Sequence, residues 1–456
     1  MSTVSNTSVF TPELLAPAGT MTHLKCAFAY GADAVYAGQP RYSLRVRNNS
    51  FKDVAALAEG IDYAHNLGRK FYLASNISPH NDKVRSYLRD LAPIIECKPD
   101  ALIMSDPGII MLVREQWPEQ EIHLSVQANT VNWATVKFWQ QQGISRVILS
   151  RELALEEVAD IRDKVPDMEL EVFVHGALCM AYSGRCLLSG YMNHRDANQG
   201  ACTNACRWQY DPVAHSTDGS GDMVPQYQDA AGTGTEAAAN TNSGQPELIE
   251  ARELLLKSPN EPGRTIPAYE DEHGTYIMNS RDLRAVQHVA ELIRMGVHSL
   301  KIEGRTKSPY YVARTSQIYR RAIDDAIAGK VFDMHLMNEL EALSNRGYTE
   351  GFFRRHPPQA FQSYEQGTST LGTEQVCGEI IDAKGNWLTI EVKNRFEQGD
   401  SLSIVSPGGN VNFTLQNMEN LDGATVTAAP GSGYTVRIPQ PVGWQMSEHC
   451  FLTRHI

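Results

Sequence analysis

Cysteines are the residues whose spacing in this sequence most clearly allows chemistry. Four of the eight form a close group, with six residues between the first two and three between the last two: Cys179, Cys186, Cys202 and Cys206. The others are scattered singly, at Cys26, Cys97, Cys377 and Cys450. A buried structural cysteine behaves as a small hydrophobe and needs no cysteine neighbour, so packing does not explain the group. Four thiolates from one segment match the ligand number of a cubane iron–sulfur cluster or of structural zinc.

Three interpretations of this cysteine group compete. The amino-terminal sequence lacks a basic end followed by an apolar core, so we expect a reducing, cytoplasmic location in which disulfides are rare. Structural zinc favours Cys-x-x-Cys spacing, which neither pair has. Iron–sulfur clusters tolerate irregular spacing, and apolar residues such as Met180 and Leu187 would shield a cluster from water. Spacing therefore favours iron–sulfur chemistry and leaves zinc and unmetallated thiols open.

The elements that must position this group alternate between strand and helix from residue 13 onwards. The predicted strands are 13–17, 34–38, 70–77, 101–105, 122–128, 147–150, 170–175 and 299–303. The predicted helices are 20–30, 52–67, 82–95, one opened by Pro107, 133–142, 155–163, 281–295 and 309–328. Eight β-then-α units predict an α/β fold, a TIM-like (β/α)8 barrel or a distorted relative of one. The alternative is an open doubly wound sheet, but no Gly-rich nucleotide loop follows the first strand.

Composition divides the chain into a large and a small domain. Residues 1–12 are expected to be a loose arm, and 13–345 the barrel domain with the cysteine group at 179–206. Residues 211–265 are rich in Gly, Ser, Thr, Ala and acids, which predicts a mobile insertion, followed by a hairpin over 265–278. Residues 346–374 are predicted to be a linker. From 375 to 456, short alternating segments between turns predict a small all-β barrel that binds nucleic acid or docks a protein.

Polar residues gather where the predicted strands end, which is where barrel enzymes place reacting groups. The candidate catalytic residues are Gln127, Asn129, His175 and Glu303, with Asn76 as a substrate-binding candidate. Each has a structural alternative: the amides could cap barrel layers, and Glu303 could form a plain ion pair with Arg305. His175 precedes Cys179 by four residues, so it could tune a cluster or shuttle protons near neutral pH, although a satisfied buried histidine is the commoner case.

Two basic groups offer further binding residues, in a chain whose formal net charge is −12. One group has six Lys or Arg between 299 and 321 against a single acid: Lys301, Arg305, Lys307, Arg314, Arg320 and Arg321. The other is without acids nearby in the sequence: Arg41, Arg45 and Arg47. Interleaved tyrosines suit stacking on unpaired bases: Tyr42, Tyr310 and Tyr311. Arg305 and Lys307 precede a helix start and could hold a carboxylate or phosphate.

The motifs around the cysteines resemble those of the collagenase-like peptidase U32 family. The resemblance is carried by EVFVHGALC at 171–179, GRCLLS at 184–189 and GACTNACRW at 200–208. It extends over most of the chain, through ELLAPAG at 13–19, GADAVY at 31–36, SVQAN at 125–129 and KIEGR at 301–305. Within the family, the likeness is strongest to members that modify tRNA.

This resemblance implies a 4Fe-4S cluster held by the cysteine group and prephenate-dependent 5-hydroxylation of the wobble uridine of tRNA. That reaction is the first step towards 5-carboxymethoxyuridine and 5-methoxyuridine. It implies tRNA, prephenate and an unidentified electron donor as partners. No apolar run reaches about 18 residues, so no membrane partner is expected. In some relatives the fourth cysteine ligand lies further downstream, which makes Cys206 the least secure ligand.

Two other functions remain open from the sequence. The family's older name suggests a peptidase, and Cys179 with His175 could form a nucleophilic dyad. However, His-Glu-x-x-His and Gly-x-Ser-x-Gly motifs are absent, and four grouped cysteines suit a metal better than one nucleophile. A non-catalytic RNA-binding scaffold with a structural metal is the second alternative.

Overall fold

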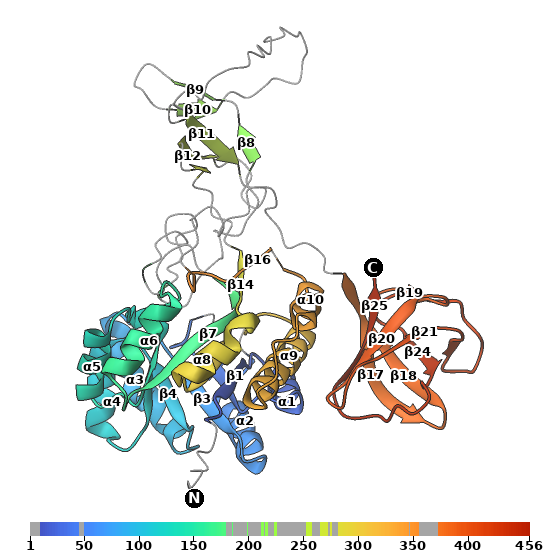
Figure 1. The fold of residues 1–456 in the computed structure, drawn as a ribbon, viewed down its shortest axis with the longest axis horizontal. Coiled ribbons are helices and arrows are strands. Elements are labelled where there is room, and N and C mark those ends of the chain that lie inside the picture. The colour runs from blue at the N-terminus through green and yellow to red at the C-terminus, as the bar shows by residue number, and fades with distance from the viewer. Residues whose placement is uncertain are drawn as a thin grey trace, which may run out of the picture.

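The computed structural model describes residues 10–44, 50–178, 185, 198, 281–345, 347–354 and 373–456, and the backbone of short strands between 211 and 275. Figure 1 shows a barrel wrapped by helices and a separate β-domain formed by the C-terminal residues. In this described part of the chain, no helix combines the length and apolar character needed to cross a membrane.

Eight parallel strands close the predicted barrel. They are β1 (Glu13–Pro17), β2 (Ala34–Gly38), β3 (Lys70–Ser75), β4 (Ala101–Met104), β5 (Ile122–Leu124), β6 (Arg146–Ile148), β7 (Glu169–Ala177) and β15 (Ser299–Ile302). Each pairs with the next along the chain, and β15 pairs with both β7 and β1. The sheet therefore has no free edge at this join, and the (β/α)8 prediction is confirmed.

Helices cover the outside of the barrel. They are α1 (Met21–Ala29), α2 (Val54–Asn66), α3 (Asn81–Ile95), α4 (Pro107–Gln116), α5 (Trp133–Gln141), α6 (Leu155–Lys164), α8 (Val289–Met295), α9 (Pro309–Ile327) and α10 (His335–Glu341). Five of them begin after a side-chain cap that accepts from the N–H three residues on: Thr20, Asp53, Asp106, Asn132 and Ser308. The side chain of Asp106, at the end of β4, thus caps α4.

Two predicted elements differ from the structure. The fifth strand ends at Leu124 and is followed by a short 3-10 helix, η2 (Val126–Ala128), because Asn129 turns the chain with a left-handed φ of 52°. The predicted helix over 281–295 begins instead with a strand, β14 (Asp282–Arg284), then η5 (Val286–His288) and α8. The strand forms because β7 continues past the barrel, and β14 pairs antiparallel with that extension.

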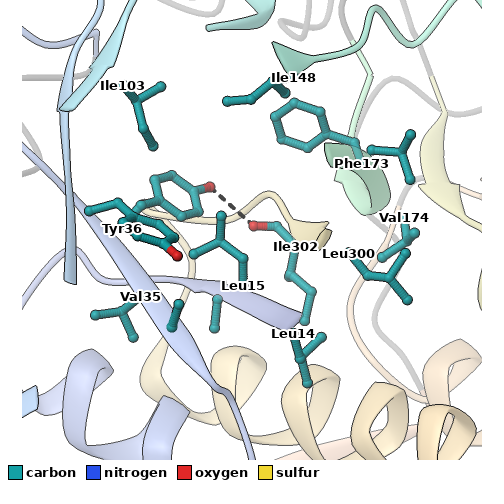
Figure 2. Packing of buried hydrophobic residues seen from close by; sticks show 14 of the residues in the cluster. Leu14, Leu15, Val35, Tyr36, Ile103, Ile148, Phe173, Val174, Leu300 and Ile302 are labelled. Atoms are coloured by element: carbon teal, nitrogen blue, oxygen red, sulfur yellow. Dashed lines mark hydrogen bonds between the residues drawn. The ribbon is translucent and has the colours of Figure 1, made fainter. Parts of the chain in front are cut away.

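The barrel core combines aliphatic and aromatic side chains. Figure 2 shows Leu14, Leu15, Phe173 and Leu300 in the same cluster as Tyr36, whose hydroxyl donates to the carbonyl of Ile302 at 3.1 Å. Parallel strands buried on both faces favour continuous apolar runs, and every residue of β2, AVYAG, is buried.

Charged residues fill the end of the barrel where its strands begin, here called the barrel floor: Glu13, Arg146, Glu171 and Lys301. Arg146 Nη1 lies 2.7 Å from Glu13 Oε1 and 3.3 Å from Glu171 Oε2, and Lys301 Nζ lies 2.7 Å from Glu171 Oε1. Burial alone would raise the pKa of Glu171, but Lys301 and Arg146 outweigh it and lower that pKa. Each floor charge therefore faces an opposite charge, as buried charges require.

Strands are present in the described backbone of 211–275, which covers the range 211–265 predicted as an insertion that builds no core and part of the hairpin predicted after it. They are β8 (Asp211–Val213), β9 (His215–Thr217), β10 (Met223–Pro225), β11 (Arg252–Lys257), β12 (Thr265–Asp271) and β13 (Gly274–Thr275). The backbone pairs as β13-β12-β11-β8 and as β10-β9. The predicted hairpin near 265–278 is the β12–β13 pair.

The C-terminal domain is all-β, as predicted. Its strands are β17 (Glu374–Lys384), β18 (Trp387–Val392), β19 (Phe396–Glu397), β20 (Ser401–Val405), β21 (Val411–Thr414), β22 (Glu419–Asn420), β23 (Ala428–Ala429), β24 (Thr435–Pro439) and β25 (Cys450–His455). Seven form one antiparallel sheet in the order β21-β20-β25-β17-β18-β24-β22, a half-barrel. It packs on α1 and α9, where the Tyr30 hydroxyl donates to the carbonyls of Val405 and His449.

Candidate active site at the barrel mouth

Predicted site residues from two strands meet at the barrel mouth, defined here as the C-terminal ends of the barrel strands. Asn76, after β3, donates from Nδ2 to Gln127 Oε1 at 3.1 Å and to Ser125 Oγ at 3.2 Å. Ser125 Oγ in turn donates to Gln127 Oε1 at 2.5 Å. Two side chains, those of Asn76 and Ser125, thus donate to the amide oxygen of Gln127.

A backbone N–H fixes the orientation of both amides. The N–H of Leu44 donates to Asn76 Oδ1 at 3.2 Å, so the Nδ2 group of Asn76 must face Gln127. Gln127 must therefore turn its oxygen towards Asn76 and its NH2 group away. Gln127 is half-buried at the mouth, and its NH2 group is a donor suited to an acceptor oxygen of a ligand.

Arg305 joins the same network from β15. Its Nη2 donates to the carbonyl of Leu44 at 2.7 Å, and its guanidinium lies 5.6 Å from the Tyr36 ring centroid. The backbone of Leu44 therefore connects Arg305, through the carbonyl, with Asn76, through the N–H. A Cβ at Gly38 would lie 2.7 Å from Arg305 Nη1 and 2.4 Å from Ser43 Oγ, so only glycine leaves room for this arrangement.

Glu303 forms its described ion pair with Arg151, at the end of β6, rather than with Arg305. The carboxylate lies 3.4 Å from Arg151 Nη2, and the Arg151 guanidinium stacks 3.8 Å from the Phe173 ring centroid. A carboxylate and two guanidinium groups therefore stand at the ends of β6 and β15. This combination can bind anionic groups and accept a proton.

His175 lies outside the mouth, against α9. Opposite a bulge in the β7–β15 pairing, its ring packs 5.4–5.8 Å from the centroids of Tyr311, Tyr319 and Tyr348. Burial lowers the pKa of His175 to about 3, so the ring is neutral near pH 7. Nε2 has no hydrogen-bond partner among the described residues. These surroundings do not support a proton shuttle near neutral pH.

Gly176 explains why the chain can leave β7 close to β15. Its φ is +104°, and a Cβ there would lie 2.4 Å from the carbonyl oxygen of Glu303. Any other residue would be strained and would clash with backbone. The barrel backbone therefore requires glycine at position 176, directly after His175.

The four grouped cysteines lie outside the described residues, but two neighbours of theirs are described. Arg185, which immediately precedes Cys186, donates from Nε to Asn129 Oδ1 at 2.9 Å. The N–H of Ser78, after β3, donates to the carbonyl of Asn198 at 3.1 Å. Arg185 and Asn198 therefore contact the mouth after the ends of β5 and β3. Within the described residues, no group of three or more His, Cys, Asp or Glu could hold a metal ion.

The scattered cysteines are packing residues. Cys26, Cys377 and Cys450 are buried, and Cys97 is half-buried. Burial raises the pKa of both Cys26 and Cys377 to about 12, which disfavours the thiolate that a metal needs.

The predicted base-stacking tyrosines require correction. Tyr310 is buried between the domains, where its hydroxyl donates to Glu374 Oε2 at 2.9 Å and its ring packs on Phe451. Tyr311 is buried beneath Glu303, and Tyr42 is buried beside α3. The interleaving in the sequence did not show that these rings point into helix packing and the domain interface.

The remaining predicted binding residues differ in position. Lys307 Nζ lies 5.3 Å from the Tyr311 ring centroid, next to the mouth. Arg41 is exposed and pairs with Asp90 of α3 at 2.6 Å, so the structure supplies an acid that the local sequence lacks. Arg45 lies outside the described residues.

Sequence reasoning missed four contributors to the mouth. The Leu44 peptide acts through its backbone, which no side-chain pattern reveals. Arg185 and Asn198 are polar residues between cysteines, and only their contacts distinguish them. Ser125 had a usable signal, because it stands at a strand end two residues before Gln127.

Similarity to known proteins covers both domains. The family model described as peptidase family U32 matches residues 19–363, and that of its C-terminal domain matches 373–449. The chain is 58% identical to tRNA hydroxylation protein P of Escherichia coli over 95% of this chain and 94% of that protein. It is 57% identical to the protein of that name in Haemophilus influenzae, over 96% and 95%. It is also 28% identical to the 23S rRNA 5-hydroxycytidine C2501 synthase of Escherichia coli, over 89% of this chain and 54% of that protein. The chain therefore belongs to peptidase family U32.

Proposed function

We propose that this protein hydroxylates tRNA, at C5 of the wobble uridine, with prephenate as co-substrate and a 4Fe-4S cluster as cofactor. The observation that carries the proposal is the 57–58% identity, over nearly the whole of both chains, to two proteins named for tRNA hydroxylation. A more distant relative is named for hydroxylating a pyrimidine of ribosomal RNA. Hydroxylation of RNA is the chemistry common to these names.

The chemistry of the cysteines supports the cofactor. Cys179, Cys186, Cys202 and Cys206 would hold the cluster, and Arg185 and Asn198 join their segment to the mouth. Such a cluster supplies electron transfer, or a site that activates an oxygen-bearing molecule. The packed cysteines elsewhere in the described chain offer no competing thiolate ligand set.

The residues of the mouth would bind the two substrates. The NH2 group of Gln127 would donate to a carbonyl oxygen of the uracil ring, in an orientation fixed by Asn76. The Arg305 guanidinium, held by the Leu44 carbonyl, would bind a carboxylate of prephenate. Hydroxylation would form a C5–O bond with an electrophilic oxygen donor, which takes up two electrons, and would break the C5–H bond. The C5 proton would then leave, and Glu303, paired with Arg151, is the mouth carboxylate suited to accept it.

The experiment combines metal analysis with nucleoside analysis. Protein purified without oxygen should contain about four irons and four sulfides per chain. Cys179→Ala and Cys206→Ala should lose both, whereas Cys97→Ala should keep them. In cells that lack other tRNA uridine hydroxylases, 5-hydroxyuridine derivatives should disappear from tRNA in the two ligand variants only. One zinc without sulfide would contradict the cofactor and favour a scaffold. Normal tRNA hydroxylation in the ligand variants would contradict a need for the cluster, and normal hydroxylation in cells without the protein would contradict the enzyme assignment.

A further inference from the structure

A basic surface lies on the outer edge of the mouth, where the loop after β2 meets α3. It is here called the α3 rim, and its basic residues are Arg41, Lys83, Arg85 and Arg89. Arg41, Arg85 and Arg89 expose 60%, 79% and 77% of their side chains. The rim therefore presents guanidinium groups to solvent.

Two carboxylates pair with the three arginines of the rim. Asp90 lies 2.6 Å from Arg41 Nη1 and 3.0 Å from Arg89 Nη2, so a single carboxylate is shared by two guanidinium groups. Its Oδ2 also accepts from the Tyr42 hydroxyl at 2.7 Å. Asp82, 93% exposed, lies 3.5 Å from Arg85 Nη1. Three arginines against two acids leave an excess of one positive charge.

The other basic group of the sequence, on α9, is neutralised. Arg314 pairs with Glu339 at 3.1 Å, and Arg320 pairs with Asp33 at 3.1 Å and with Asp324 at 2.8 Å. Arg321 also pairs with Glu339. The arginines of α9 are thus neutralised by acids, whereas the α3 rim keeps a positive excess in a protein whose net charge is −12.

The rim is continuous with the candidate active site. α3 follows β3, so its N-terminal turns lie at the mouth, and Figure 1 shows α3 in the outer layer of helices. Asn76 and Ser78 stand between β3 and α3. The first belongs to the amide network, and the second contacts Asn198 of the cysteine segment. The loop that carries Arg41 also carries Leu44, which holds Arg305. A chain crossing the rim would therefore lead into the mouth.

We propose that the α3 rim binds the phosphodiester backbone of the RNA whose base enters the mouth, with Arg85 and Arg89 as phosphate contacts. The proposal rests on the proposed function for the identity of the substrate. Guanidinium groups bind phosphate oxygens by two parallel hydrogen bonds and keep their charge at all physiological pH values. Backbone contacts of this kind position an RNA without reading its sequence. They explain how an acidic protein could hold a polyanion through one local surface.

The test compares two full-length variants with the same change in charge. R85E/R89E alters the rim, and K164E/K330E alters exposed lysines at the C-terminal ends of α6 and α9, on the floor side of the barrel. The probe is tRNA from cells that lack the modification, and its dissociation constant is measured by fluorescence anisotropy from 50 to 300 mM KCl. We expect R85E/R89E to weaken binding about tenfold or more and to flatten the log–log salt slope by about 1.4. K164E/K330E should remain within about twofold of wild type.

The outcomes separate this proposal from the proposed function. Equal weakening in both variants would mean a general charge effect and would overturn the rim. An unchanged affinity in R85E/R89E, with wild-type protein binding and hydroxylating tRNA, would also overturn the rim and leave the function standing. Wild-type protein that neither binds tRNA nor forms 5-hydroxyuridine would overturn the function itself. Melting curves of each variant serve as the folding control, since the substituted side chains are exposed.

Discussion

The two ends of the barrel both carry charged and polar side chains, but they satisfy them differently. At the floor, Arg146 contacts Glu13 and Glu171, and Lys301 contacts Glu171, so the buried charges are paired within the protein. At the mouth, the amide network turns the NH2 group of Gln127 away from its neighbours. A polar network in which every group is paired within the protein stabilises the fold, whereas a network that turns one donor outwards can bind a ligand. Barrel enzymes in general keep stability at the N-terminal end and chemistry at the C-terminal end.

The largest expected effect is on stability, at the floor. Arg146→Met leaves Glu13 and Glu171 with less compensation inside the barrel, and breaking a buried ion network by removing one partner costs about 3–5 kcal/mol. We expect the barrel unfolding transition in urea to shift by that amount. Arg305→Met at the mouth is the matched control, since Arg305 donates to the neutral carbonyl of Leu44 rather than to a buried carboxylate, and it should cost about 1 kcal/mol. Equal losses in the two variants would remove the distinction between the ends.

The second effect is on activity, at the mouth. Gln127→Glu keeps the oxygen that accepts from Asn76 and Ser125 but replaces the outward NH2 group by an oxygen. We expect tRNA hydroxylation to fall about 100-fold, the usual loss for one donor aimed at a reacting group, with an unchanged melting temperature. Quantitative nucleoside analysis after single-turnover reactions measures the rate.

Ser125→Ala provides the control for that change. It removes one hydrogen bond to Gln127 Oε1 and leaves both the outward NH2 group and the contact with Asn76. We expect it to retain hydroxylation within about threefold. A loss as large as that of Gln127→Glu would show that the network matters as a whole and that the outward donor has no separate role.

The third effect tests the placement of His175 outside the mouth. The folded pKa is lowered to about 3, against an ordinary value of 6.5, so the unfolded chain binds a proton that the folded chain does not. This histidine's contribution to stability is therefore complete above pH 6.5 and is lost as pH falls towards 3. The expected slope is about 1.4 kcal/mol per pH unit in that window. His175→Phe should remove it, measured by urea unfolding at pH 4.5, 5.5, 7 and 8.

The measurements at pH 7 and 8 are the internal reference for this test. Between them, wild-type and His175→Phe proteins should differ by a constant, since neither state of the histidine titrates there. The activity of the variant is the second readout. A wild-type slope that persists in the variant would contradict the buried neutral histidine.

The barrel and the β-domain could be predicted because their signals are local. Alternating apolar and helical patterns, Ser308 as a cap and Pro107 at a helix start each depend on a few neighbouring residues. The strand at 282–284 could not be predicted in this way, because it forms against an extension of β7 that lies far away in the sequence.

The candidate site was predictable in part for the same reason. Gln127, Asn76 and Arg305 follow from their positions at strand ends, and the structure brings them together. The bulge beside Ile302, which accompanies the placement of His175 against α9, has no local signature. Nor does the burial of Tyr310 against Phe451, because it needs the second domain. Side-chain types at strand ends indicate a mouth, but long-range packing decides which of them face it.

The smallest expected effect is at the outer edge of the mouth and is a gain. Asp82 is 93% exposed, and its contact with Arg85 is a surface ion pair between residues three apart on a helix, so Asp82→Asn should change stability by under about 0.5 kcal/mol. It raises the excess positive charge of the α3 rim by one, and we expect tRNA to bind about two- to threefold more tightly at 100 mM KCl, with a steeper salt dependence. Asp163→Asn, at an exposed acid near the C-terminal end of α6 on the floor side of the barrel, carries the same charge change and should not alter binding. A gain in both variants would indicate that the net charge of the whole protein, rather than the rim, governs the attraction.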